Sequence, residues 1–125
     1  MMVRTFRDLI AWQRGMELAR VLYSGTVRMP PKEQFGLTNQ MRRAAVSIPS
    51  NIAEGHARQS RQEYIRFLKM SRGSLAELST QVELAISLTM LPANQRLEEL
   101  IREEDRILQG LIVSLERKTR QERQQ

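Results

Sequence analysis

A proline inside a helical pattern is the feature that most constrains the fold of this chain. Apolar residues recur every three or four positions around it, as on one face of a helix: Leu37, Met41, Ala44, Ile48 and Ile52. A proline in a helix interior, here Pro49, removes a backbone hydrogen bond at a cost of about 3 kcal/mol. Ser47, Ser50 and Asn51 could bond the freed backbone groups. Since the residues around Pro49 are small, another helix can approach closely, and we expect a kinked central helix.

The remaining sequence predicts three further helices and no strand. We expect helices over about residues 7–29, 34–55, 61–91 and 93–119, with a frayed tail at 119–125. Thr5 resembles an N-terminal cap of the first helix, and Ser60 with Glu63 forms a capping box before the third. Short connections predict an all-α, antiparallel up-down-up-down four-helix bundle. A chain of 125 residues fits one such domain, residues 1–125.

Composition excludes several classes of protein and site. The chain has no cysteine, which excludes disulfides, thiolate zinc sites and cysteine nucleophiles. Arginines interrupt the apolar residues of the N-terminus, and no run of about 20 apolar residues occurs. We therefore expect a soluble, cytoplasmic protein with no signal peptide and no membrane partner.

Catalytic constellations are absent from the sequence. The single histidine, His56, has no second ligand or nucleophile nearby in the chain, so we expect a surface or capping role. The paired carboxylates near residues 98–105 are sequence neighbours and point apart on a helix. The Glu-x-x-His pairs of diiron bundles and the glycine-rich phosphate loops are also missing. We expect no enzymatic activity, no metal and no cofactor.

Positive charge is concentrated in the middle of the chain. Residues 28–72 hold nine basic and three acidic side chains, an excess equal to the whole net charge of +6. Such a zone attracts polyanions, and nucleic acid is the obvious candidate. The alternative is a bias of composition alone, because seventeen of the twenty basic residues are arginine. The residues proposed to bind nucleic acid are Arg43, Arg58, Arg61, Arg66, Lys69 and Arg72.

Stacking of nucleobases is not expected at this site. The chain has six aromatic residues, and helical spacing predicts that Trp12, Tyr64 and Phe67 are packed in the core. A row of cations along the third helix would contact phosphates without reading sequence. We therefore expect recognition of shape and charge rather than of single-stranded bases.

Three segments also carry a resemblance to a known family. They are FRDLIAWQ (Phe6–Gln13), RRAAVSIPSNIAEG (Arg42–Gly55) and YIRFLKMSRGSLAEL (Tyr64–Leu78). With them the chain resembles the four-helix-bundle proteins encoded in intervening sequences of bacterial 23S ribosomal RNA genes. The resemblance implies a ring of five subunits without known catalytic activity, and the fold is distantly similar to the accessory variability protein of diversity-generating retroelements. Structural roles are expected for the motif residues Arg42, Arg43, Pro49, Ser50, Asn51, Ile52, Ala53, Glu54 and Gly55.

Self-association is also predicted from the apolar residues themselves. Nine of them lie off the single helix seams: Ile10, Leu18, Leu22, Ile65, Phe67, Ile86, Leu88, Leu100 and Ile112. Such wide apolar faces predict interfaces between copies, unless these residues only widen the stripe that each helix buries in its own bundle. Two functions are therefore open. The first is a homo-oligomeric bundle that binds RNA, another nucleic acid or a nucleic-acid-processing protein, and the second is a protein–protein interaction scaffold with no nucleic-acid role. A small-molecule site between helices stays open as a third possibility.

Two glutamates are expected to serve the structure. Glu54 lies among small and apolar residues, so we expect it to be partly buried and paired with Arg43, Arg58 or backbone amides. Glu104 lies at a seam position of the fourth helix, where an arginine across the bundle or at an interface would balance its charge.

Overall fold

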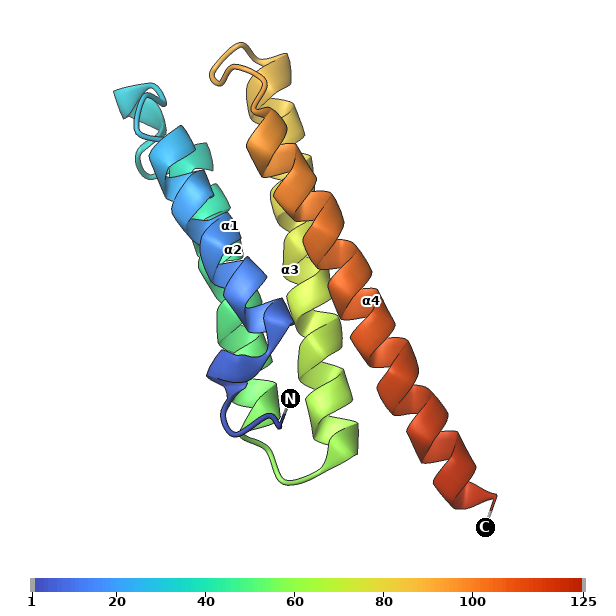
Figure 1. The fold of residues 1–125 in the computed structure, drawn as a ribbon. Helices are drawn as coiled ribbons and strands as arrows, with labels where there is room; N and C mark the ends of the chain where they lie inside the picture. Colours follow the sequence, from blue (N-terminus) through green and yellow to red (C-terminus); the bar gives the residue numbers. More distant parts are fainter. Residues whose placement is uncertain (1, 125) are drawn as a thin grey trace.

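Four α-helices make up the fold. The computed structural model describes residues 2–124, and the described residues contain no strand. The helices are α1 (Ile10–Gly25), α2 (Leu37–His56), α3 (Arg61–Ser87) and α4 (Gln95–Arg123). Figure 1 shows that the chain reverses direction from each helix to the next, with both termini at one end of the molecule. The predicted all-α four-helix fold is confirmed.

The first helix is shorter than predicted at both ends. Thr5 caps the chain as expected, since its side chain accepts from the Arg7 N–H and the Asp8 carboxylate accepts from the Thr5 N–H. This capping box opens only a 3-10 turn, Phe6–Asp8, because Leu9 is extended (φ −76°, ψ 128°) and interrupts the helical path. The expected span of 7–29 is therefore wrong, and α1 covers Ile10–Gly25.

The ends of α3 and α4 follow local capping. The Ser60 hydroxyl accepts from the Glu63 N–H at 3.0 Å and starts α3 as predicted. The helix stops at Ser87 rather than at 91, because Thr89 has a left-handed φ of 57°. Asn94 then caps α4, its side chain accepting from the Leu97 N–H at 3.0 Å.

The tail predicted to fray is helical as far as Arg123. Its residues favour helices, and Arg120 and Arg123 lie in the last turn, where the helix dipole favours positive charge. Nη1 and Nη2 of Arg61 donate to the Glu122 carboxylate, at 2.8 and 2.9 Å, and tie this turn to α3. The expectation for residue 125 lies outside the described residues.

Helix α2 runs through Pro49, which is buried. The Asn51 amide donates to the Ser47 carbonyl at 2.8 Å and the Ser47 hydroxyl to the Ala44 carbonyl at 2.7 Å. From α3, the buried Ser71 hydroxyl donates to the Ile48 carbonyl at 2.9 Å. These bonds engage three carbonyls in the turn before the proline, and α2 continues unbroken through Pro49, while a bend at this point stays a prediction.

Most of the apolar residues that suggested wide faces are buried within one copy. Leu18, Leu22, Phe67, Leu100 and Ile112 lie in the core of the bundle, whereas Ile10 and Leu88 are exposed. The reading that these residues only widen each helix's own stripe therefore holds for the majority of them. No helix within residues 2–124 combines the length and the hydropathy needed to span a bilayer.

Candidate nucleic-acid interface

The basic residues predicted along α3 are already paired with carboxylates. The five ion pairs are Arg58–Glu54 (2.9 Å), Arg61–Glu122 (2.8 Å), Arg66–Glu63 (2.7 Å), Lys69–Glu116 (3.0 Å) and Arg72–Asp105 (2.8 Å). A cation in such a pair must share its charge with the carboxylate before it can hold a phosphate. The α3 row is therefore much less positive than its sequence suggests.

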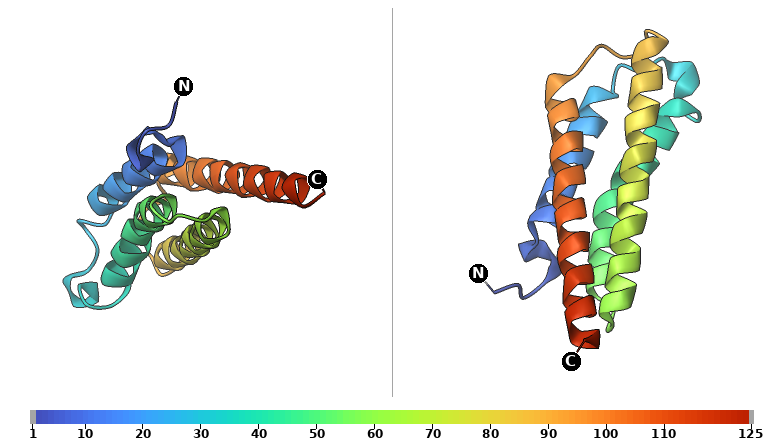
Figure 2. Two further views of the ribbon diagram at one scale, coloured as in Figure 1. Left: turned by 90° about the horizontal axis from the view of Figure 1, so that it is seen from below. Right: turned by 90° about the vertical axis from the view of Figure 1, so that its right-hand side faces the viewer.

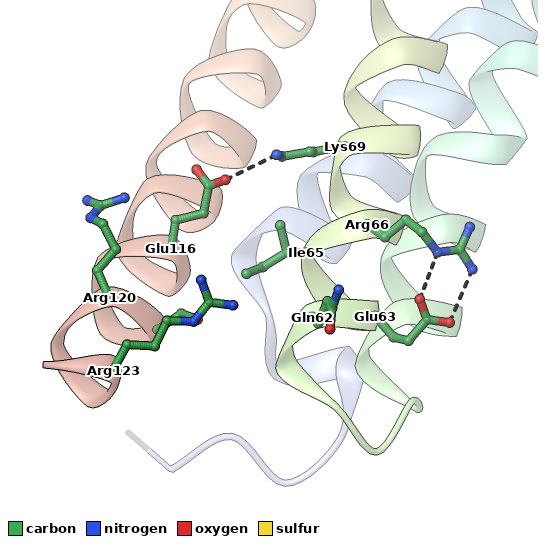
Figure 3. Close-up of a pocket in the computed structure, with 9 residues that line it drawn as sticks. Gln62, Glu63, Ile65, Arg66, Lys69, Glu116, Arg120 and Arg123 are labelled. Carbon is green, nitrogen blue, oxygen red and sulfur yellow. Dashed lines mark hydrogen bonds and ion pairs between the residues drawn. The ribbon is translucent and has the colours of Figure 1, made fainter. Parts of the chain in front are cut away.

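Three of these pairs join α3 to α4. Lys69 reaches Glu116 across a cleft of about 520 Å³ between the two helices (Figure 3). Arg61 and Arg72 make equivalent bridges to either side of it. Figure 2 (left) shows the C-terminal half of α4 pointing away from the other helices, and two of the ion pairs, Lys69–Glu116 and Arg61–Glu122, tie this half to α3. Their main role is to fasten α4.

The same cleft also holds cations without a carboxylate partner. Arg120 and Arg123 line its α4 wall, and neither forms an ion pair within residues 2–124. In Figure 3, no dashed line reaches either guanidinium, whereas Arg66 on α3 is held by Glu63. The cleft is therefore of mixed charge, with free positive charge only on its α4 side.

A second group of unpaired cations lies on α1, α2 and the turn before α1. Arg7, Arg20, Arg42 and Arg43 form no ion pair with any residue of the described chain. Of the six residues predicted to bind nucleic acid, only Arg43 belongs to this group, and its side chain is exposed. We call these four residues the α1–α2 arginines.

These arginines surround an apolar groove of about 680 Å³ between α1 and α2. Arg20 lines the groove directly, and Arg43 lies one turn before Val46 and two turns before Ser50 on the same face of α2. The guanidinium of Arg42 lies 4.6 Å from the ring centroid of Tyr23, and that of Arg7 lies 4.5 Å from the centroid of Phe6. Both rings line the groove, so its aromatic walls carry positive charge.

Arg42 also has a structural task. Its Nε donates to the Thr26 hydroxyl at 3.0 Å, and its Nη2 donates to the Tyr23 carbonyl at 3.3 Å. These bonds satisfy groups at the C-terminal end of α1, where the helix dipole favours a cation. The guanidinium is thereby fixed in place while its charge has no carboxylate partner among residues 2–124.

Two motif residues, Glu54 and Gly55, have well-defined surroundings. Glu54 is exposed rather than partly buried, and it pairs with Arg58, one of its expected partners. Gly55 is buried in the last turn of α2, which ends at His56. A Cβ at Gly55 would stand 2.6 Å from the Cβ of Phe67, which shows that glycine is needed for close packing of α2 on α3.

A buried glutamate, Glu104, lies near Pro49 in the interior of the bundle. Glu104 is wholly buried, with an exposed fraction of 0%, and neither carboxylate oxygen has a hydrogen-bond partner within residues 2–124. A Cβ on Gly15 would stand 2.8 Å from Glu104 Oε2 and 3.4 Å from Pro49 Cβ, so the three residues crowd together. The predicted arginine partner is wrong, because Arg14 pairs with the neighbouring Glu103 at 2.8 Å.

The environment of Glu104 favours its neutral form. Burial, together with the nearby Glu103 charge, raises the pKa of Glu104 to about 8, and the more distant Arg14 opposes this only in part. A protonated carboxyl can donate a hydrogen bond, which suits a bundle centre that holds no charge partner. Glu104 lies in the core and lines neither the α3–α4 cleft nor the other cavities, which indicates a structural role.

Sequence reasoning missed the groove because it assigned Trp12 to the core. Trp12 is only half-buried and lines the groove beside Phe6, with ring centroids 5.3 Å apart in an edge-to-face arrangement. Tyr64 is half-buried as well, and both it and Trp12 pack against the core, while Phe67 is buried, so the predicted packing of these three rings holds. The available signal was the spacing of Trp12, Met16, Arg20 and Tyr23 along one face of the first helix.

Nothing among the described residues suggests metal chemistry. No group of three or more histidine or acidic side chains within residues 2–124 is placed to hold a metal ion. His56 ends α2 and packs edge-to-face on Tyr64, with ring centroids 5.7 Å apart. This contact agrees with a structural role for the single histidine.

Comparison with known proteins gives a family and a fold. The chain is similar in fold to a protein of unknown function from the S23 ribosomal protein family of Bacteroides thetaiotaomicron, with a TM-score of 0.72 and 22% identity over 82% of this chain and 95% of that one. A comparison with curated proteins gave no significant match. Residues 7–112 match the family of 23S rRNA-intervening sequence proteins. Because this match covers most of the chain, the protein belongs to the family of 23S rRNA-intervening sequence proteins.

Proposed function

We propose that this protein is a non-enzymatic, cytoplasmic bundle that binds RNA through the cations that have no carboxylate partner. The observation that carries the proposal is the difference in ion pairing between the cations predicted along α3 and the α1–α2 arginines. The α3 cations are neutralised by ion pairs, whereas the α1–α2 arginines are not. Membership of a family named for an intervening sequence of 23S ribosomal RNA agrees with RNA as the polyanion.

Unpaired arginines suit phosphate recognition for physical reasons. A guanidinium offers donors in a planar fork that matches phosphate oxygens, and it stays charged at every relevant pH. The four α1–α2 arginines could each neutralise one phosphate. Since single-strand affinity changes with salt at a slope of about −0.7 per contact, four contacts give a slope near −3. Binding should weaken about fifty-fold between 50 and 200 mM salt.

The test compares unpaired with paired cations. Arg20→Gln combined with Arg43→Gln removes two unpaired charges from exposed positions. The matched control, Arg66→Gln combined with Glu63→Gln, removes a whole ion pair and leaves net charge unchanged. RNA affinity is measured by fluorescence anisotropy of a labelled strand over a range of salt concentrations.

We expect the first variant to lose affinity and about 1.4 units of salt slope, and the control to match the parent. Circular dichroism of both variants confirms that helicity is kept. An equal loss of RNA affinity in both variants would show that the α3 cations contribute as much to binding as the α1–α2 arginines. If the parent protein binds no RNA at low salt, the nucleic-acid role is wrong. The protein-interaction reading would then be favoured.

We propose further that the protein is a homo-oligomer, with the five-subunit ring implied by the family resemblance as the expected form. Exposed apolar side chains support association, above all Phe35, which is 87% exposed in the connection before α2. Sedimentation velocity of the full chain tests the assembly, and a single species of monomer mass at micromolar concentration would contradict it. The distant likeness to the accessory protein of retroelements stays a prediction.

A further inference from the structure

The α1–α2 groove differs from the other surface cavities in its charge. Its lining contains one arginine and no carboxylate, whereas each of four other cavities is lined by at least one acidic side chain. The remaining α1–α2 arginines surround it, as described above. An anion in this groove therefore meets positive charge and no carboxylate in the lining, while the exposed Glu54, one turn after Ser50 on α2, is paired with Arg58.

The walls of the groove are suited to flat, apolar rings. Phe6, Trp12 and Tyr23 contribute aromatic surface, and Tyr23 is 43% exposed although it lies beside a hydrophobic cavity. The α2 side is lined by small or apolar residues, including Pro49 and Ala53, which leave space for a planar group to enter. Nucleobases stack on such surfaces, and the stacking tolerates any base because every base has a π-face.

We infer that the α1–α2 groove binds the unstacked bases of single-stranded RNA while the α1–α2 arginines hold the flanking phosphates. The inference rests on the proposed RNA-binding function and assigns it a site and a strand form. Aromatic walls framed by cations favour an anionic occupant with flat rings over a second copy of the chain, because the segment around its exposed Phe35 contains Lys32 and Glu33 and therefore carries no net charge. A duplex could contact the arginines but could not place its paired bases in the groove.

The protein contains a built-in reporter for this site. Trp12 is the only tryptophan of the chain, and it lines the groove. The full-length protein is titrated with a short oligouridylate and with an RNA duplex of the same length, while tryptophan emission and anisotropy of the labelled RNA are recorded. We expect saturable quenching of Trp12 by the single strand, and binding of the duplex without quenching.

Two variants test the groove without altering charge. Tyr23→Leu removes an exposed aromatic wall, and Ser50→Leu places a larger side chain at the exposed α2 edge of the groove. Each should weaken oligouridylate binding by at least about five-fold. Ser50→Leu should leave duplex affinity unchanged, and Tyr23→Phe, which keeps the ring beneath Arg42, should restore the oligouridylate affinity that Tyr23→Leu loses. Because Ser50 is an exposed helix position that accepts leucine, the second variant keeps the test valid if the first is unstable.

The outcomes separate this inference from the proposed function. If RNA binds with a steep salt dependence but neither quenches Trp12 nor responds to Tyr23→Leu and Ser50→Leu, the groove assignment is overturned and the RNA-binding proposal stands. If neither RNA form binds, both fail. A shift of Trp12 emission that follows protein concentration rather than RNA would show that a second copy occupies the groove and would also overturn the inference.

Discussion

Replacing Glu104 by glutamine should remove a large pH dependence of stability. The buried carboxyl has no partner among residues 2–124, and burial raises its pKa to about 8 from an ordinary 4.5. Glutamine keeps the shape of the side chain but cannot ionise. The substitution Glu104→Gln therefore changes the proton linkage while it leaves the packing against Gly15 and Pro49 in place.

The direction and size of the effect follow from the two pKa values. Between pH 4.5 and 8 the folded state holds a proton that the unfolded state has released, so the unfolding free energy falls as the pH rises. At about 1.4 kcal/mol per unit, the full loss above pH 8 is on the order of 5 kcal/mol. At pH 7 it is on the order of 3 kcal/mol, a large share of a typical domain stability. Below pH 4.5 the loss is absent, because the carboxyl is protonated in both states.

Urea unfolding followed by circular dichroism from pH 4 to pH 9 measures this difference. The unfolding free energy of the Glu104→Gln variant should equal that of the parent near pH 4 and exceed it by a growing amount above pH 5. Glu98→Gln serves as control, since Glu98 is exposed on the same helix, and it should reproduce the parent's pH dependence. Parallel stability curves for the parent and the Glu104→Gln variant would refute the reasoning, because they would mean that Glu104 ionises in the folded protein as easily as in the unfolded one.

Three further substitutions test the packing. Gly55→Ala should destabilise the bundle by at least about 1 kcal/mol in urea unfolding, since its Cβ would stand 2.6 Å from the Cβ of Phe67; a stability equal to the parent's would show that α2 and α3 can separate freely. Gly110→Ala is the control, and it should raise the unfolding free energy by about 0.5–1 kcal/mol, because a Cβ there meets nothing within 4 Å and alanine favours the helix. A lower unfolding free energy than the parent's would mean that another copy of the chain packs against Gly110. Ile48→Asp buries a charge in the core and should abolish cooperative unfolding and lower helicity in circular dichroism, so parent-like spectra would contradict the placement of α2.

Local signals predicted the helices better than their ends. The Thr5 and Ser60 caps could be read from sequence because a cap depends on residues three or four positions apart. The end of α3 could not, since it depends on the left-handed backbone of Thr89, which a threonine rarely adopts. The helical tail of α4 also depends on a distant residue, because Arg61 holds Glu122 from another helix.

The candidate site was harder to predict because charge pairing is a property of the fold. A count along the chain places the basic excess in residues 28–72, but Lys69 and Arg72 meet Glu116 and Asp105 only through the register of α3 against α4. That register is set by the core of both helices and leaves no local trace in the sequence. Net charge by segment therefore predicts attraction to polyanions without indicating which face carries the unpaired cations.

The motif around Pro49 connects the core to the groove. On its inner side Pro49 packs near Gly15 and Glu104, where small size allows α1 to approach α2. On its outer side Pro49 and Ala53 line the α1–α2 groove, where the same small size leaves the space that a longer side chain would fill. Because one short segment meets both demands, a substitution there that enlarges a side chain would disturb the packing of α1 and close the groove together. Loss of RNA binding in such a variant is therefore informative only beside a stability measurement, which is why the exposed edge residue Ser50 is the better probe.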